Sequence, residues 1–176
     1  MKQRKMTPGV FAFAAQIYLS RYFSSRFMLK RALERRAIRF IRKHGGTMEE
    51  ARPLIDAEIE KHVKSGAVDD LSFAKTMIAE LQKSGDSKLK IKQKLFKKGI
   101  PSSIMDKVFS EQEDKPRRSA LRYAKKRGFG PYRAPHITED RSQKELASMV
   151  RAGHAYGVSK DILSLSREEA DEEEDV

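Results

Sequence analysis

SGAVDDLSFAKTMIAELQKSGDSKLKIKQKLFKKGIPSSIMDKV, residues 65–108, is the stretch that decides the fold. Turn and capping signals divide it into three short helices, expected over residues 71–83, 87–98 and 101–111. Asp69 or Asp70 caps the first helix, and Gly99 ends the second. Residues 87–94 alternate like a strand, but their cap and the length of the segment favour a helix.

The spacing of this stretch recurs on both sides of it, which indicates an internal repeat. A serine followed by apolar residues four and eight positions later predicts a capped helix with one buried stripe. The three copies are Ser25, Leu29 and Leu33; Ser87, Ile91 and Leu95; and Ser142, Leu146 and Val150. Shorter matches stand in the same register, namely Gly99, Ile104 and Val108 with Gly153, Val158 and Ile162, and Ala15 and Tyr18 with Ala120 and Tyr123. The third copy is one residue short between Val150 and Gly153.

The rest of the chain carries further helix signals. Helices are expected over residues 9–22, 25–44, 52–65, 116–127, 142–152 and 158–167. Thr47 and Glu50 have the spacing of a capping box, but Pro53 favours a start of the third helix at Arg52. Residues 128–141, which contain Pro131 and Pro135, predict a long solvated loop.

The fold class that follows is all-α, with tandem three-helix repeats that form an elongated, curved body. The expected divisions are residues 1–66 for the first repeat with a long linker, 67–113 for the second, 114–167 for the interrupted third and 168–176 for an acidic tail. Residues 168–175 (EEADEEED) offer no apolar side chain larger than Ala170 to bury. The sequence therefore predicts that the tail is disordered.

The middle stretch resembles the core of RecX-type regulatory proteins, which modulate the bacterial recombinase RecA. The family pattern is a Gly-x-x-Asp-Asp turn, then x-x-Phe-Ala at a helix start, then a basic helix that ends in Lys-Gly-Ile. The matching positions are Gly66, Asp69, Asp70, Phe73, Ala74, Lys98, Gly99 and Ile100. A looser likeness extends over residues 12–165. The resemblance implies a curved array of three-helix repeats that binds the RecA filament on DNA and suppresses its ATPase, strand-exchange and coprotease activities.

Composition agrees with a binding protein. The chain has 176 residues and a net charge of +12, which is typical of a protein with a polyanionic partner. It has no cysteine, which excludes disulfides and thiolate metal sites. The basic start and the apolar stretch at 10–19 faintly resemble a signal peptide, but we interpret them as the first structural helix. We expect a cytoplasmic monomer that does not associate with membranes.

Basic residues cluster on three of the expected helices, and these clusters carry the functional argument. Residues 1–44 hold twelve Lys or Arg against one acid, Glu34. The residues predicted to contact a partner or nucleic acid are Arg31, Arg35, Arg36, Arg39, Lys90, Lys94, Lys97, Lys98, Arg118, Arg122, Lys125 and Lys126. Lys90, Lys94 and Lys97 form one stripe beside the apolar stripe of their helix. The alternative is a solvated helix face with no partner. Few aromatic residues accompany the clusters, so phosphate or carboxylate contact is a better expectation than base stacking.

Catalytic motifs are not recognisable, and we expect neither an enzyme nor a cofactor. The four histidines, His44, His62, His136 and His154, show no ligand spacing and are interpreted as surface or turn residues. Asp69 and Asp70 could suggest paired acids, but their place at a helix start favours capping. A hydrolytic or metal enzyme is therefore the weakest hypothesis.

Two functional hypotheses remain. The first is a regulator of the recombinase–DNA filament, and the alternative is a helical nucleic-acid-binding protein with no recombinase partner. The acidic tail adds a third question. Its seven acids would leave the rest of the chain seven charges more positive than the whole. The tail either lies over the basic groove and competes with DNA phosphates, or acts only as a solubilising end.

Overall fold

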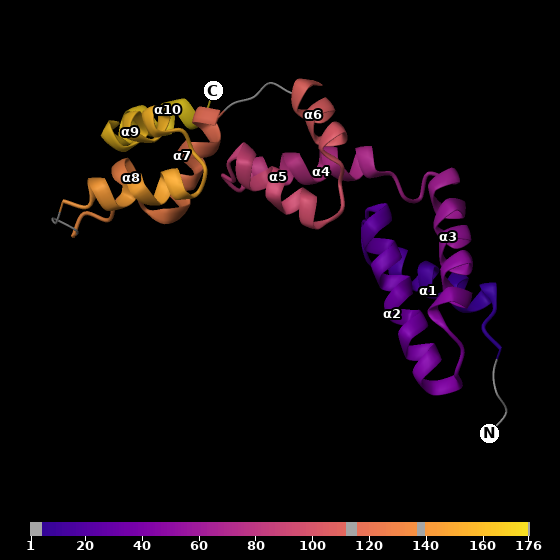
Figure 1. Cartoon of the computed structure of the whole chain (residues 1–176). Helices are drawn as coiled ribbons and strands as arrows, with labels where there is room; N and C mark the ends of the chain where they lie inside the picture. Colours follow the sequence, from indigo (N-terminus) through magenta and orange to yellow (C-terminus); the bar gives the residue numbers. More distant parts are fainter. Residues whose placement is uncertain (1–4, 112–115, 137–139, 176) are drawn as a thin grey trace. The chain divides into compact units, whose positions relative to one another are not determined.

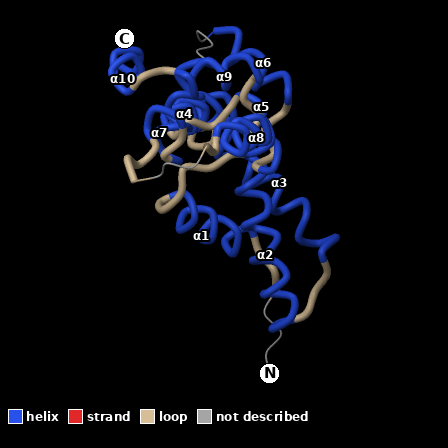
Figure 2. Tube along the Cα trace, turned by 90° about the vertical axis from the view of Figure 1, so that its left-hand side faces the viewer, coloured by secondary structure: helices blue, strands red, loops and turns tan. Residues whose placement is uncertain are grey.

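The computed structural model describes residues 5–111, 116–136 and 140–175. In these ranges every regular element is a helix, and no strand occurs (Figures 1 and 2). The α-helices are α1 (Pro8–Leu19), α2 (Arg26–His44), α3 (Met48–Lys64), α4 (Asp70–Lys83), α5 (Lys88–Lys97), α6 (Ser102–Glu111), α7 (Pro116–Arg127), α8 (Ser142–Arg151), α9 (Tyr156–Ser164) and α10 (Arg167–Asp175). A 3-10 helix, η1, covers Gly130–Tyr132. The all-α prediction is confirmed, and residues 88–94 are helical rather than extended.

The chain divides into two compact units. The first comprises Met1–Ala74 with Phe96–Ile104, and the second comprises Lys75–Leu95 with Met105–Val176. The division runs through α4, α5 and α6, the helices of the predicted middle repeat. Among the described residues, no helix is both long and apolar enough to cross a bilayer.

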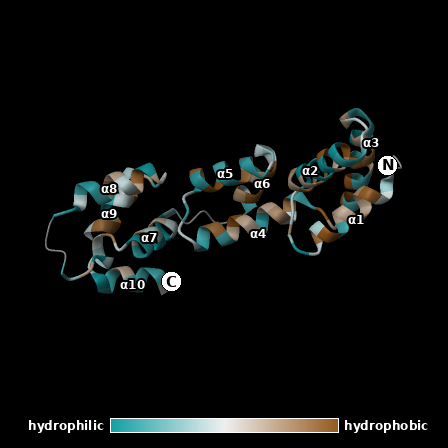
Figure 3. Cartoon of the chain, turned by 90° about the horizontal axis from the view of Figure 1, so that it is seen from below, coloured by the Kyte–Doolittle hydropathy of each residue, from teal (hydrophilic) through white to brown (hydrophobic). Residues whose placement is uncertain are grey.

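The first unit is built on a three-helix core. α1, α2 and α3 all pack on one another, and Phe11, Leu29 and Leu33 are fully buried between them. The stripe predicted from Ser25 is therefore confirmed. Figure 3 shows α1 mostly in pale to brown colours, as its apolar sequence leads one to expect. The apolar N-terminal stretch contributes core residues of this unit.

α3 begins four residues earlier than the prediction from Pro53. Thr47 and Glu50 form a complete capping box, in which each side chain accepts a hydrogen bond from the other residue's backbone N–H. Pro53 lies inside the helix and cannot donate to the carbonyl of Glu49. That residue is exposed at the helix start, so water can solvate its carbonyl. The start predicted at Arg52 was wrong because the capping box outweighs the proline.

The second unit has a core of α7, α8 and α9, with η1 and α10 packed against it. Leu121, Met149 and Ile162 are almost fully buried there. Gly153, Val158 and Ile162 repeat the pattern of Gly99, Ile104 and Val108, and the last residue of each set is fully buried. The predicted recurrence of this pattern is confirmed.

The third copy of the serine stripe has a different register from the predicted one. Val150 is 41% exposed, whereas Glu145 and Met149, one position earlier, are buried. The helix cap is Arg141 rather than Ser142. Counted from Arg141, the steps to Glu145, Met149 and Gly153 are all four residues, so no residue is missing. The prediction failed because it required an apolar residue where the chain has a buried glutamate.

Glu145 is buried because residues 128–133 supply its partners. Its carboxylate accepts hydrogen bonds from Arg133 Nη2 at 2.7 Å, Arg133 Nε at 2.9 Å and the Gly130 N–H at 2.9 Å. Tyr132 of η1 is 8% exposed and belongs to the core of the second unit. This part of the predicted solvated loop is therefore ordered and packed, because one anion holds it against α8.

The predicted disorder of the acidic tail was also wrong, since Arg167–Asp175 form α10. Ser166 and Glu169 make a reciprocal capping box: the Ser166 N–H donates to Glu169 Oε2 at 2.8 Å, and the Glu169 N–H donates to Ser166 Oγ at 3.2 Å. Ala170 is fully buried, and its carbonyl accepts a hydrogen bond from the Tyr132 hydroxyl at 3.3 Å. Figure 3 shows α10 largely in teal, the colour of hydrophilic residues. Its capping box and its ion pairs, rather than a large apolar contact, therefore hold it in place.

Candidate nucleic-acid interface

The cations of α2 fall into two groups with different surroundings. Arg26 and Lys30 form ion pairs with Glu60 and Asp56 of α3. The four predicted interface residues of this helix, Arg31, Arg35, Arg36 and Arg39, are all exposed. Arg31 lies over the Phe27 ring at 5.8 Å, while the other three have no hydrogen bond or ion pair with any described residue. Three of the four predicted guanidinium groups on α2 are therefore unpaired among the described residues.

These three arginines line a cavity of about 680 Å³ between α1 and α2. Its other lining residues include Arg21 and the side chains of Phe13, Tyr18 and Tyr22. Sequence reasoning missed this combination because it used only Ala15 and Tyr18 of this helix, as matches to Ala120 and Tyr123. The available signal was a second stripe on the same helix, Phe13 and Ile17, which the structure leaves exposed.

The predicted lysine stripe of α5 is only partly available. Lys90 and Lys97 are exposed and unpaired among the described residues, but Lys94 forms an ion pair with Asp86. Lys98 is half-buried and lies 6.0 Å from the centre of the Phe73 ring. α5 therefore presents two free ammonium groups in place of the predicted row of three.

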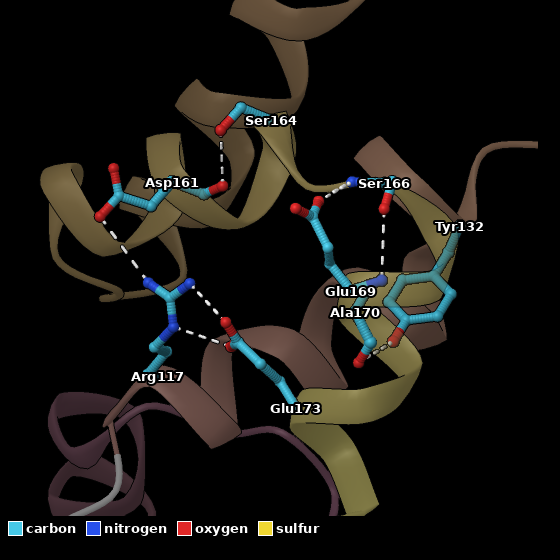
Figure 4. Close-up of polar contacts among 8 residues, drawn as sticks. All are labelled: Arg117, Tyr132, Asp161, Ser164, Ser166, Glu169, Ala170 and Glu173. Carbon is cyan, nitrogen blue, oxygen red and sulfur yellow. Dashed lines mark hydrogen bonds and ion pairs between the residues drawn. The ribbon is translucent and has the colours of Figure 1, made fainter.

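Three of the six cations of α7 contact α10, namely Arg117, Arg118 and Lys125, and Figure 4 shows the first of these contacts. Arg117 donates two hydrogen bonds of 2.8 Å to the Glu173 carboxylate, from Nε and Nη2. Its guanidinium also lies 3.7 Å from the Asp161 carboxylate. Lys125 forms an ion pair with Glu174, and Arg118 Nη2 donates to the Glu174 backbone carbonyl at 3.1 Å.

The electrostatics of the α7–α10 contact agree with its geometry. Hydrogen bonding to Glu173 raises the pKa of Arg117, and hydrogen bonding to Glu174 raises the pKa of Lys125. The hydrogen bonds from Arg117 hold the pKa of Glu173 below its usual range. Of the four predicted contact residues on α7, Arg118 and Lys125 therefore have acidic-helix partners, while Arg122 and Lys126 have no ion pair among the described residues.

Three of the acids and histidines singled out in the sequence, Asp69, Asp70 and His154, have structural roles. Asp69 Oδ1 accepts a hydrogen bond from the Leu71 N–H at 2.9 Å, and Asp70 Oδ1 accepts one from the Arg26 N–H at 2.8 Å. The interpretation of these acids as capping and turn residues is confirmed. His154 is 6% exposed beneath Tyr123, so it is a buried turn residue. No cluster of three or more His, Asp or Glu side chains suited to a metal ion occurs among the described residues.

Comparisons with known proteins agree with the family resemblance found in residues 65–108. Residues 69–108 match the family described as RecX, second three-helix domain. The chain is 33% identical over 165 residues to the regulatory protein RecX of Myxococcus xanthus (strain DK1622), covering 92% of this chain and 88% of that protein. It is 32% identical over 106 residues to the regulatory protein RecX of Agrobacterium fabrum (strain C58 / ATCC 33970), covering 60% of this chain and 56% of that protein. No solved structure matches significantly. A likeness of this extent places the chain in the RecX family of regulatory proteins.

Proposed function

We propose that this protein is a non-catalytic regulator that binds the filament formed by the recombinase RecA on DNA. In this proposal it inhibits the ATPase, strand-exchange and coprotease activities of the filament, and it acts as a cytoplasmic monomer without a cofactor. Its membership of the RecX family supports the choice of RecA as the partner. The observation that carries the proposal is a set of exposed cations with no ion pair or hydrogen bond to a described residue, namely Arg35, Arg36, Arg39, Lys90 and Lys97.

Unpaired cations on a helix surface have a physical consequence. Like charges spaced four residues apart weaken a helix by a few tenths of a kcal/mol, and a bound anion offsets that repulsion. A recombinase filament offers two kinds of anion, the phosphates of its DNA and the carboxylates of its protein surface. Guanidinium groups suit both, because they donate two parallel hydrogen bonds to either group.

α10 supplies a means of regulation within the same proposal. Its acids hold the cations of α7 that a phosphate would otherwise contact. The Arg117–Glu173 pair is about 40% exposed on both sides, and such pairs contribute about 0–1 kcal/mol. A DNA phosphate must therefore compete with the acids of α10 for these cations, whereas the filament also offers protein carboxylates to the cations outside α7. In this proposal α10 favours the filament over bare DNA.

The decisive experiment measures RecA ATPase on single-stranded DNA with and without this protein. We expect stoichiometric protein to reduce turnover, and the double variant Lys90→Glu with Lys97→Glu to reduce it much less. The matched control is Lys64→Glu with Lys160→Glu, which changes net charge equally at two exposed lysines that have no ion pair with a described residue. Unchanged turnover with the parent protein would remove the regulatory function. If the parent still bound DNA, the alternative of a nucleic-acid-binding protein without a recombinase partner would replace it.

A further inference from the structure

The cavity between α1 and α2 has an unusual apolar lining for a surface site. Phe13 is 63% exposed, Tyr22 is 55% exposed and Ile17 is 40% exposed, and all three line the cavity. Burial of apolar side chains stabilises a complex in proportion to the area removed from water, so three exposed neighbours represent a large unused contact area. Tyr18 lies beside Tyr22 with ring centroids 5.1 Å apart, which adds another ring to the same wall. Contiguous exposed patches of this kind mark binding sites.

The charge around these rings has one sign. Arg21, Arg35, Arg36 and Arg39 line the cavity, and none of its described lining residues is acidic. None of the four guanidinium groups has an ion pair or hydrogen bond with a described residue. The side of α2 that faces α3 differs, because Arg26 and Lys30 there are neutralised by Glu60 and Asp56. The positive charge of the α1–α2 side is therefore left for a ligand.

The geometry points to a binding site for single-stranded nucleic acid in this cavity. The site needs a ligand with regularly spaced anions and flat apolar faces, because cations and aromatic rings line the same space. A single strand provides phosphates for the arginines and unstacked bases for Phe13 and Tyr22. A duplex would supply the phosphates but keep its bases stacked inside, so the rings would stay exposed. This contact with the strand is direct and does not require recombinase.

The inference differs from the expectation drawn from the sequence. The low aromatic content made phosphate or carboxylate contact a better expectation than base stacking. The structure gathers three of the aromatic side chains beside four of the arginines in one cavity. The cavity is therefore rich in aromatic side chains although the chain as a whole is not. We expect base stacking to contribute a large part of the affinity for a single strand.

The test measures binding of a fluorescent oligothymidylate by anisotropy, without recombinase, over a range of salt concentrations. Three strands are compared: the oligothymidylate, a duplex of equal length, and an abasic strand that keeps the sugar–phosphate backbone. The key variant is Phe13→Ala with Tyr22→Ala, which removes the exposed rings and keeps every charge. Its matched control is Phe96→Ala with Tyr156→Ala, the same residue types at positions that are 73% and 61% exposed and do not line the cavity.

The ring variant should bind oligothymidylate about tenfold or more weakly than the parent, with an unchanged salt slope. The control variant should bind like the parent. The abasic strand should bind the parent about tenfold or more weakly than oligothymidylate, and the ring variant should lose most of that difference. Arg35→Gln with Arg39→Gln should reduce the salt slope by about 1.4, since each phosphate contact on a single strand contributes about 0.7.

Two outcomes would overturn the inference. The first is equal affinity of the parent and the ring variant for oligothymidylate. The second is equal affinity of the parent for the abasic strand and for oligothymidylate, which would leave a purely ionic surface. If the first outcome came with loss of RecA inhibition, the cavity would be assigned to a protein partner. Because the binding assay contains no recombinase, its failure is distinguishable from failure of the proposed function.

Discussion

Ser25 Oγ donates a hydrogen bond of 2.6 Å to the backbone carbonyl of Lys98, a residue 73 positions further along the chain. The second unit repeats this relationship, since Ser87 Oγ donates to the Ala152 carbonyl at 2.6 Å. Both serines also cap their helices by accepting a backbone N–H, from Met28 and Lys90. In each case one hydroxyl therefore caps the N-terminus of a helix and also bonds that helix to a turn of the next repeat.

A glycine follows each accepting carbonyl, and each glycine lies against the residue two positions after the serine. A Cβ on Gly99 would overlap the Cβ of Phe27, and a Cβ on Gly153 would lie 2.5 Å from Ser87 Oγ and 3.2 Å from the Cβ of Leu89. The close approach of these turns explains why both positions need glycine.

The first prediction separates this close approach from backbone strain. Gly99 and Gly66 have almost the same positive φ, 75° and 74°, but nothing lies within 4 Å of a Cβ on Gly66. Gly66→Ala should destabilise by about 1–2 kcal/mol because of the left-handed backbone alone. Gly99→Ala should cost about 1–3 kcal/mol more, since Phe27 must move. Chemical denaturation of both variants checks this, and equal losses would show that the contact with Phe27 is soft.

The second prediction concerns Glu145, which takes the place of a buried apolar residue in the repeat. Burial would raise the pKa of Glu145, but the hydrogen bonds from Arg133 and from the Gly130 N–H hold it below its usual value. A carboxylate with a lowered pKa stabilises the fold fully above its ordinary value of 4.5, and that stabilisation is lost as the pH falls through the lower folded value. Glu145→Gln should therefore lower the stability at neutral pH.

The measurement for Glu145 is the free energy of unfolding at neutral and at acidic pH. The difference between parent and Glu145→Gln should be largest at neutral pH and should shrink below 4.5. Asp140→Asn is a useful comparison, because Asp140 also has a lowered pKa but is exposed, and its hydrogen bonds to described residues go to Ser142 alone. A neutral-pH loss for Glu145→Gln no larger than that for Asp140→Asn would contradict the structural role of the buried pair.

The same glutamate shows where sequence reasoning stops. The stripes of the first two repeats, Leu29 with Leu33 and Ile91 with Leu95, were predictable because apolar side chains at helical spacing need no partner. Glu145 needs Arg133 and the turn at Gly130, and the spacing of residues along α8 does not reveal either contact. The register of α8 was therefore predicted one residue late. In a sequence, a charged residue is interpreted as a surface residue unless its buried counter-ion is known.

The candidate site was predictable to a similar extent. The basic clusters on α2, α5 and α7 follow directly from composition, and most of their cations are exposed. The ion pairs of these cations were not predictable. Asp86 pairs with Lys94 across a turn, and Glu173 pairs with Arg117 across most of the second unit. The order of α10 had a sequence signal, the Ser166–Glu169 capping-box spacing, which the acidic composition masked.

The third prediction is a pH dependence that originates at His154. Burial lowers the pKa of its imidazole, opposed by the nearby Asp86 carboxylate and by a hydrogen bond to the Gly85 backbone. Tyr123 packs against the ring, and Lys90, Arg127 and Arg151 line the same cavity. Because the unfolded chain takes up this proton more readily, stability is full above the ordinary pKa of 6.5 and falls as the pH drops below it.

His154→Asn tests this dependence, because asparagine offers a neutral N–H close to the position of Nδ1. We expect the parent to lose stability on going from pH 7 towards the lowered folded pKa, and the variant to lose less over the same interval. Thermal unfolding across that pH range provides the measurement. Parallel curves for the two proteins would mean that His154 titrates alike in the folded and unfolded states.

The last prediction concerns α10. Deletion of residues 167–176 frees Arg117, Arg118 and Lys125, so the truncated protein should bind single-stranded DNA more tightly at low salt. If two further phosphates are contacted, the salt slope should steepen by about 1.4, and the gain should therefore shrink as salt rises.

A deletion also changes the net charge and exposes part of Tyr132, so substitutions on an intact α10 give a cleaner comparison. Glu173→Gln with Glu174→Gln removes the two carboxylates that hold α7. Glu168→Gln with Glu172→Gln changes the charge equally at exposed acids that have no partner among the described residues. Competition for α7 requires that only the first pair tightens DNA binding. Equal gains from both pairs would mean that α10 acts through net charge alone, as a solubilising end.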